Sequence, residues 1–278
     1  MSKVLIVIPA RYASTRLPGK PLLNIAGVAM LKRVANVAAY VAAKLDNCAY
    51  VVATDDQRIA DFCRAEHLPF VMTAQHCQSG TERCWDAVQK SEPKPAFIVN
   101  LQGDNPLCPP WFLERLILDW QQQQKTHTPQ ASQVFTPFVH LSWQELDQLR
   151  EQKKVTPFSG TTVQVDREGY ALTFSKIILP AMRKESTLRV QLPKSPVRRH
   201  IGLYAYTYQA LAQYFSLPAG QYEDPEGLEQ MRFLEHGIRV KMVEVDYRGR
   251  TGMSGVDSPE DIARAEAILA RDGEFVLN

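Results

Sequence analysis

Short apolar runs that alternate with helical patterns constrain the fold of this chain more than any other feature. Residues 3–9 form a largely β-branched run that ends at a proline, which is typical of a strand buried on both faces of a sheet. Similar runs follow at residues 50–53 and 96–101, and apolar residues recur at helical spacing over residues 30–45. A further helix is expected over residues 57–66. This alternation predicts an α/β fold with a mostly parallel, mixed sheet.

The second half of the chain has a looser pattern. Strands are expected there at residues 133–138, 161–166 and 201–206. Residues 180–196 contain prolines and cationic side chains, and we predict an irregular arm. The last helix is expected to begin at Ser258, because this serine N-cap is followed by a proline at the first helical position and an acid at the third. No linker is evident, which favours a single domain.

The composition argues against several classes of protein. The formal net charge is only +2, and no basic stripe with stacking aromatics is present, so we expect no nucleic-acid partner. The five cysteines form no C-x-x-C pair, which argues against a disulfide framework or a thiolate zinc site. No apolar stretch has the length of a membrane span, and the first apolar run resembles a buried strand more than a signal peptide. We therefore expect a soluble, cytoplasmic protein.

A basic loop follows the first predicted strand. Arg11, Arg16 and Lys20 lie at the carboxyl end of that strand, where open α/β sheets bind ligands. Gly19 and small polar residues such as Ser14 let backbone N–H groups approach an anion. The loop fits a polyphosphate, although a solvated basic loop would explain the same residues. It is neither a Walker loop nor a dinucleotide fingerprint, because the glycines that those motifs need are missing.

Two aspartates are candidate ligands for a divalent metal. Asp104 follows the third apolar run on a loop that opens at Gly103, and Asp257 lies just ahead of the last predicted helix. Magnesium takes hard oxygen ligands, usually one or two protein carboxylates together with phosphate and water. The alternative for Asp257 is that it only supports the helix cap. The two residues form a metal site only if the sheet brings them together.

Several motifs occur in the order found in one enzyme family. They are IPARYASTRLPGKPL, ATD, SGTER, QGDNP, EGYALTFSK, RHIGLYAY, LEQMR and GVDSPEDI, and they extend from Val4 to about Glu266. In these motifs the chain resembles the 3-deoxy-manno-octulosonate cytidylyltransferases, or CMP-Kdo synthetases. The resemblance implies a nucleotide-diphospho-sugar transferase fold in one cytidylyltransferase domain over residues 1–278. It also implies a homodimer and Mg²⁺ as cofactor.

The resemblance implies a reaction as well. The anomeric hydroxyl of a 3-deoxy-octulosonate attacks the α-phosphorus of CTP and pyrophosphate leaves, which provides a precursor for lipopolysaccharide. Positioning and charge neutralisation dominate a transfer of this kind. We therefore expect no protein nucleophile.

The site residues follow from the same motifs. The resemblance implies that CTP is bound by Arg11, Ser14, Arg16, Lys20, Ser79, Gly80, Arg83 and Gln102. It implies catalytic roles for Arg11, Lys20, Asp104 and Asp257, the last two as magnesium ligands. The positions that would face the sugar acid are Lys176, His200, Tyr204, Asp224, Glu229 and Gln230. Without the resemblance, a packed core histidine is the better interpretation of His200.

The chain departs from the family pattern in its sugar half. Lys176 stands where arginine is usual, Asp224 where histidine is usual, and Thr162 near a usual lysine; in the nucleotide half, Asn105 replaces a glutamate. Lysine lacks the planar, bidentate donor of arginine, and Asp224 adds a carboxylate that suits a protonated amine. Kdo and its 8-amino derivative are therefore both candidate substrates. The alternative for Asp224 is the N-cap of a helix that begins at Pro225.

Two rival functions remain open at this point. A CMP-sialate or other nonulosonate synthetase shares the first and last motifs loosely. A catalytically inactive nucleotide-sugar-binding protein would keep the fold, but the intact set of Lys20, Asp104 and Asp257 argues against such decay.

Overall fold

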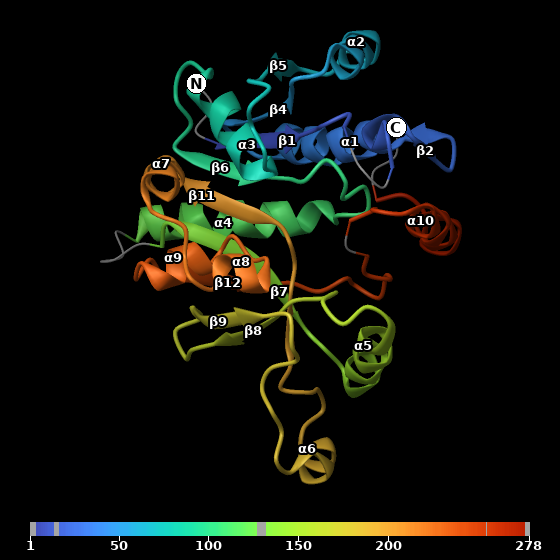
Figure 1. The fold of residues 1–278 in the computed structure, drawn as a ribbon, viewed down its shortest axis with the longest axis vertical. Coiled ribbons are helices and arrows are strands. Elements are labelled where there is room, and N and C mark those ends of the chain that lie inside the picture. Colours follow the sequence, from blue (N-terminus) through green and yellow to red (C-terminus); the bar gives the residue numbers. More distant parts are fainter. Residues whose placement is uncertain (1–3, 14–16, 127–131, 254, 276–278) are drawn as a thin grey trace. The chain divides into compact units, whose positions relative to one another are not determined.

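The computed structural model describes residues 4–13, 17–126, 132–253 and 255–275, and its contacts divide the chain into two compact units (Figure 1). The first unit comprises Met1–Leu118, Leu203–Tyr208 and Tyr247–Asn278. The second unit comprises Asp119–Gly202 and Gln209–Asp246. The single domain expected over residues 1–278 stays a prediction.

A mostly parallel sheet forms the centre of the first unit. Its strands are β1 (Val4–Pro9), β4 (Cys48–Thr54), β5 (Phe70–Met72), β6 (Phe97–Asn100) and β11 (Tyr204–Thr207). Their order is β5-β4-β1-β6-β11, with β11 antiparallel to β6 and the other neighbours parallel. Every residue of β1 is buried, which confirms the prediction of a strand covered on both faces.

Amphipathic helices accompany this sheet. They are η1 (Lys20–Leu22), α1 (Met30–Lys44), α2 (Gln57–Ala65), α3 (Gly80–Gln89), the start of α4 (Pro110–Lys125) and α10 (Pro259–Asp272). A short hairpin of β2 (Asn24–Ile25) and β3 (Val28–Ala29) leads into α1. In α1 the buried residues Val34, Val37 and Val41 recur at helical spacing, as the sequence predicts. The start of α10 is also confirmed, since Ser258 and Asp261 form a capping box.

The second unit has its own strands and helices. Its strands are β7 (Val134–His140), β8 (Thr162–Val165), β9 (Ala171–Ser175), β10 (Arg198–His200) and β12 (Val240–Glu244). β12 is parallel to β7, and β7, β10, β8 and β9 pair antiparallel in that order. Its helices are α5 (Trp143–Val155), α6 (Glu185–Gln191), most of α7 (Tyr208–Ser216), α8 (Glu223–Glu226) and α9 (Met231–Glu235).

The strands predicted in the second half of the chain are only partly confirmed. The first two are present as β7 and β8, whereas the strand expected at residues 201–206 begins at Tyr204, because the chain bends at Gly202 after β10. Among the residues that the structure describes, no helix combines the length and apolar character needed to cross a membrane.

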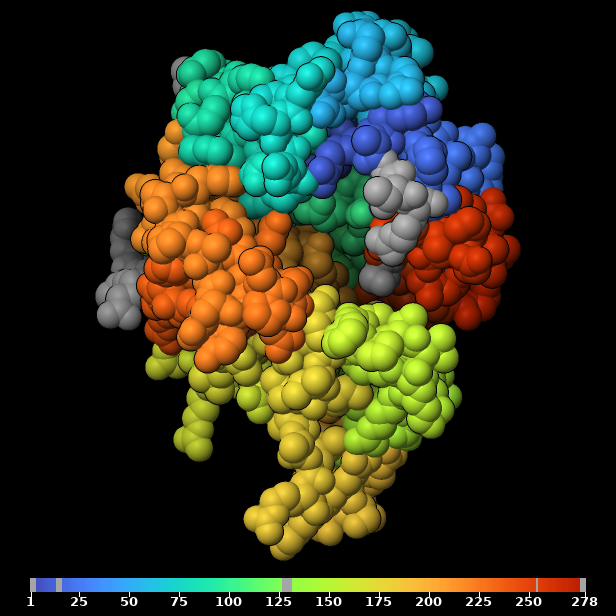
Figure 2. Space-filling view, in the orientation of Figure 1, coloured from blue at the N-terminus to red at the C-terminus, as the bar shows by residue number. Residues whose placement is uncertain are grey.

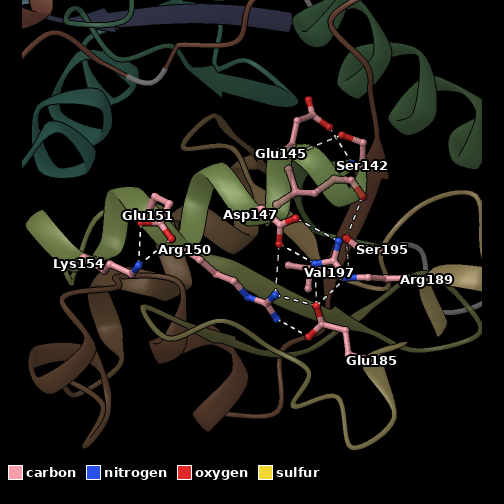
Figure 3. A network of polar contacts seen from close by, with 11 residues as sticks. Ser142, Glu145, Asp147, Arg150, Glu151, Lys154, Glu185, Arg189, Ser195 and Val197 are labelled. Carbon is pink, nitrogen blue, oxygen red and sulfur yellow. Dashed lines mark hydrogen bonds and ion pairs between the residues drawn. The ribbon is translucent and has the colours of Figure 1, made fainter. Parts of the chain in front are cut away.

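The arm of residues 180–196 contains α6, so the prediction of an irregular arm is wrong for this part of it. Figure 2 shows the arm protruding from the second unit, in gold. None of the residues of α6 is buried, and ion pairs hold the helix to α5 (Figure 3). Arg150 donates to both carboxylate oxygens of Glu185 at 2.7 Å, and Arg189 donates to Glu185 at 2.7 Å and to Asp147 at 2.6 Å.

Candidate active site

Gly19 shapes the loop that follows β1. Its φ of 69° lies in the left-handed region that glycine adopts without strain, and its N–H donates to the Tyr12 carbonyl at 3.0 Å. A Cβ at Gly19 would also meet the Tyr12 hydroxyl at 3.0 Å. The Arg58 guanidinium lies 3.3 Å from the centroid of the Tyr12 ring and fixes that ring in turn. Tyr12 and Gly19 therefore lie in contact before η1 begins.

A glycine also allows the loop after β6 to approach the end of β1. A Cβ at Gly103 would lie 2.5 Å from the carbonyl oxygen of Pro9, so no larger residue fits without a shift of the backbone. Because β1 and β6 are parallel neighbours, their carboxyl ends lie at the same edge of the sheet. Asp104 follows directly and is placed at this edge.

The segment before α10 carries Asp257 to the same edge. The Val256 N–H donates to the Asp104 carbonyl at 2.8 Å, which ties the two segments together. Ser258 and Asp261 make the cap of α10. The carboxylate of Asp257 accepts a hydrogen bond from Lys20 instead, so supporting the cap is not its only role.

Lys20 joins the two aspartates. Its ammonium donates to Asp104 at 2.9 Å and to Asp257 at 3.0 Å. Burial alone would lower the pKa of Lys20, but the two carboxylates outweigh burial and raise the pKa above its usual 10.5. Lys20 is therefore charged at neutral pH. The aspartate side chains are 36% and 44% exposed, so both present carboxylate oxygens to a ligand in the cleft.

These side chains border a cleft of about 380 Å³ within the first unit. It is lined by Pro9, Ala10, Arg11, Ala13, Lys20, Pro21, Gly80, Gln102, Gly103, Asp104 and Asp257. The structure thus brings together all four residues predicted to be catalytic. Gly80 and Gln102, two further predicted CTP ligands, also line the cleft. Ser14 and Arg16 lie outside the described residues.

The two carboxylates fit a divalent metal. Asp104 and Asp257 offer hard oxygen ligands, and both bond to one ammonium, so their oxygens converge on a single cationic position. No cluster of three or more His, Cys, Asp or Glu side chains suited to a metal occurs in the part of the chain that the structure describes. Further ligands for magnesium at this site would therefore come from phosphate or water.

A polar chain orients the side chain of Gln102 at the start of α3. The Gln102 amide donates to Asn100 at 3.2 Å, and the Asn100 amide donates to Thr81 at 3.4 Å. Gly80 leaves room for the Gln102 amide, because a Cβ there would lie 2.6 Å from its Oε1. The sequence analysis missed Asn100. In the sequence, Asn100 stands out only as a polar residue near the end of an apolar run.

Ser79 and Arg83 make bonds within the protein and are not among the residues that line the cleft. The Ser79 hydroxyl caps α3 by accepting the Glu82 N–H at 3.0 Å. Arg83 is fully buried and donates to Thr73 at 2.5 Å and to Asp55 at 3.1 Å. The contacts of Ser79 and Arg83 with CTP stay predictions.

The predicted sugar-binding residues are divided between the units. Tyr204 lies in the first unit, and Lys176, His200, Asp224, Glu229 and Gln230 lie in the second. Tyr204, Lys176 and Glu229 are half-buried, His200 and Gln230 are buried, and Asp224 is exposed. Their contacts with a sugar stay predictions.

His200 has the surroundings of a packed core histidine, the alternative that the sequence left open. Burial, and then the charge of Lys176, lower the pKa of His200 to about 3, so its ring is neutral at pH 7. Its Nε2 lies 2.7 Å from the Thr136 hydroxyl oxygen, and its ring packs edge-on against Phe174. A neutral imidazole of this kind can offer a hydrogen bond but no charge.

The carboxylate next to Lys176 is that of Glu226, which the sequence analysis missed. The Lys176 N–H donates to Glu226 at 2.8 Å. Asp224 lies in the first turn of α8, which begins at Glu223 and has no side-chain cap, so the N-cap interpretation of Asp224 is wrong. The N-cap position is that of Tyr222, two residues before Asp224, and the Glu223 carboxylate accepts the Gly220 N–H at 3.2 Å.

Comparison with known proteins decides the family. The sequence model of the family described as Cytidylyltransferase matches residues 5–242. The 3-deoxy-manno-octulosonate cytidylyltransferase of Maricaulis maris is 41% identical over 273 residues, which cover 98% of this chain and 99% of that protein. The chain belongs to the 3-deoxy-manno-octulosonate cytidylyltransferase family. It is therefore a nucleotidyltransferase.

Other comparisons agree with this cytidylyltransferase assignment. The enzyme of the same name from Dichelobacter nodosus is 38% identical over 270 residues, covering 96% of this chain and 98% of that protein. A solved CMP:2-keto-3-deoxy-manno-octonic acid synthetase complexed with CTP has a TM-score of 0.79 and 32% identity, covering 98% of this chain and all of that one. A 4-diphosphocytidyl-2C-methyl-D-erythritol synthase from Anaerococcus prevotii, at 12% identity and a TM-score of 0.55 over 97% of both chains, shares the fold alone. The predicted α/β fold class is confirmed.

Proposed function

We propose that the chain transfers CMP from CTP to the anomeric hydroxyl of a 3-deoxy-octulosonate and releases pyrophosphate, for lipopolysaccharide precursor synthesis. The observation that carries the proposal is the cleft in which Lys20 bridges Asp104 and Asp257. The sugar is taken from the names of the relatives, and CTP from the solved complex.

The residues of the cleft suit this transfer. The anomeric oxygen forms a bond to the α-phosphorus of CTP while the bond from that phosphorus to pyrophosphate breaks. Among the described residues, the cations that line the cleft are Arg11 and Lys20. We assign them to the phosphate oxygens, where they offset the charge of the leaving group. The sugar itself is the nucleophile, so the chain has only to bind and orient both substrates.

We assign magnesium to Asp104 and Asp257. When bound, Mg²⁺ neutralises phosphate charge and so favours departure of pyrophosphate. Lys20 contributes by holding the two carboxylates toward one position, since it bonds to both. Gly80 and Gln102 are assigned to the nucleotide, and we expect CTP to be strongly preferred over UTP and ATP.

The identity of the sugar is the finer part of the proposal, with Kdo as the default and 8-amino-Kdo as the second candidate. The second candidate depends on Lys176 and on a carboxylate that could pair with an amine. Asp224 is exposed, whereas Glu226 lies at Lys176 and is already bonded there. Competition between the two sugars, repeated on Asp224→His, tests the role first given to Asp224. A preference for Kdo, or a variant with unchanged preference, would reject that role.

We further propose a cytoplasmic homodimer, by analogy with the family. Exposed apolar side chains in the second unit offer a candidate contact surface; they are Val155, Phe158, Ile177 and Val190, between 65% and 88% exposed. In a dimer, contact between the two copies of the chain would cover such side chains from water.

The decisive experiment is pyrophosphate release with CTP and a panel of sugar acids. Release with 3-deoxy-octulosonates but not with sialic acids is the expected result. Release with sialic acid would favour the nonulosonate rival. No release with any acid, from protein that binds CTP, would favour an inactive binding protein.

A further inference from the structure

Side chains hold the backbone of the second unit where the chain leaves β9. The Glu226 carboxylate accepts two hydrogen bonds there, one from the Ser175 hydroxyl and one from the Lys176 N–H, both at 2.8 Å. On the other side of the same residue, the Lys153 ammonium donates to the Lys176 carbonyl at 2.6 Å. Both backbone groups of Lys176 are therefore bonded to charged side chains from other elements, α8 and α5.

Lys153 is itself firmly anchored. Its ammonium also donates to the carbonyls of Pro157 and Ser159, so its three protons are directed at three backbone oxygens. Burial, followed by the charges of Lys176 and Arg199, lowers its pKa. Through these bonds the Lys153 ammonium links the end of α5 to Lys176, the residue after β9.

The side chain of Lys176 is half-buried and interacts with charges of both signs. Burial lowers its pKa, and the charge of Glu226 partly offsets this. Glu226 from α8 acts on its charge, and that charge in turn acts on Lys153 from α5 and on His200 from β10. His200 is neutral, and both carboxylate oxygens of Glu226 already accept hydrogen bonds. The ammonium groups of Lys176 and Lys153 and the carboxylate of Glu226 together carry a net positive charge.

We propose that Glu226 and Lys153 are positioning residues that fix Lys176 for the carboxylate of the sugar acid. The inference rests on the proposed function, in which Lys176 binds the sugar. Glu226 holds the N–H of Lys176 and Lys153 holds its carbonyl, so the direction of the side chain is set from both sides of its Cα. Neither positioning residue has to touch the sugar.

The test compares Glu226→Gln and Lys153→Met with the wild type in steady-state kinetics. Ser175 and Lys176 donate to different oxygens of Glu226, and in glutamine one of these is replaced by an NH₂ group that cannot accept. We expect each variant to raise KM for the sugar acid about tenfold or more, because each loses one charge-assisted hydrogen bond. KM for CTP should change by less than about twofold. Glu151→Gln is the matched control, because Glu151 is exposed and pairs with Lys154 within α5.

The pH profile separates positioning from a general loss of structure. Lys176 must be protonated to attract a carboxylate, and the charge of Glu226 raises its pKa. Removing that charge in Glu226→Gln lowers the pKa, so the basic limb of kcat/KM for the sugar acid should move to lower pH. An unchanged KM in both variants, or a raised KM with an unmoved basic limb in Glu226→Gln, overturns the inference.

The wild type is measured first, so that two failures can be told apart. If the wild type transfers CMP to no sugar acid, the proposed function is wrong. The inference about the backbone of Lys176 is then still testable. Hydrogen exchange of the Lys176 amide then still tests that inference, since Glu226→Gln should speed exchange there and Glu151→Gln should not. Equal exchange in wild type and Glu226→Gln would overturn it.

Discussion

At the scale of single residues, Lys20 and its two partners determine what the cleft can do. The Lys20 side chain is only 13% exposed, and a charge so far from water is stable because Asp104 and Asp257 pair with it. Removing either carboxylate has two effects. It takes one hard oxygen ligand from the cleft, and it leaves the ammonium with a single partner.

We predict that Asp104→Asn or Asp257→Asn lowers turnover by about a hundredfold or more, because each change weakens metal coordination. Pyrophosphate release at limiting magnesium is the measurement, and circular dichroism checks the fold. Asp46→Asn serves as the control, since Asp46 is exposed and is not among the residues that line the cleft. Wild-type rates in a folded Asp104 or Asp257 variant would reject the metal assignment.

A second residue-scale prediction concerns Gly80. In Gly80→Ala the new Cβ would lie 2.6 Å from the Gln102 amide oxygen, so the amide must move away from Asn100 and from the nucleotide position. We expect KM for CTP to rise about tenfold, as for one lost hydrogen bond with some strain. Gly202→Ala is the matched control, because nothing lies within 4 Å of a Cβ there. Equal KM values in the two variants would contradict this role of Gly80.

At the scale of elements, α6 is held by ion pairs and not by burial of apolar side chains. A helix as short as Glu185–Gln191 is not stable alone, and no residue of it is buried. Glu185 accepts hydrogen bonds from Arg150 and Arg189, which lower its pKa from 4.5 to about 2 (Figure 3). A carboxylate with a lowered folded pKa stabilises the fold above its unfolded pKa, and this contribution is lost as the pH falls toward 2.

We therefore predict that α6 loosens between about pH 4.5 and pH 2, the interval between the two pKa values of Glu185. The measurement is the amide protection factor over residues 185–191, which corrects for the intrinsic pH dependence of exchange and is expected to fall. At pH 7, Glu185→Gln should show the same loosening with a cost of no more than about 1 kcal/mol, because the pair is partly exposed. If amide protection in α6 changes neither with pH nor in Glu185→Gln, then other contacts hold the helix.

At the scale of the whole molecule, the path of the chain links the two units. It passes from one to the other after Leu118, Gly202, Tyr208 and Asp246. Neither unit is therefore a continuous piece of sequence, and neither can be separated by a single cut. This path favours cooperative folding of the whole chain.

We predict one thermal unfolding transition for residues 1–278, and a higher Tm with CTP and magnesium, because ligand binding stabilises the folded state. Scanning calorimetry with and without the ligands is the measurement. Two separate transitions, with only one of them moved by CTP, would show two domains instead of the single domain that we propose.

The oligomeric state gives the other prediction at this scale. We expect a dimer by light scattering at micromolar concentration, and a shift toward monomer in Val190→Asp, because Val190 is 88% exposed on the protruding arm. Val155→Asp probes the same surface from α5. A monomeric wild type would reject the homodimer proposal.

The sequence predicted much of the candidate site because strand ends, glycines and charged residues leave local signals. The polar residues after β1 and β6 were found in this way, and all four predicted catalytic residues line one cleft. Asn100 and Glu226 were missed because their importance lies in what they contact. Asp224 was interpreted as an N-cap, but α8 begins one residue before it, at Glu223.

The sequence by itself determined the buried β1, the helix that starts at Ser258 and the kinds of side chain available for phosphate and metal. These depend on neighbours within a few residues, through periodicity, capping and burial. Only the tertiary structure decided that Asp104 and Asp257 meet at Lys20, and that His200 is buried and neutral. Those outcomes depend on strand order and on the close approach of segments far apart in the chain, which no local pattern contains.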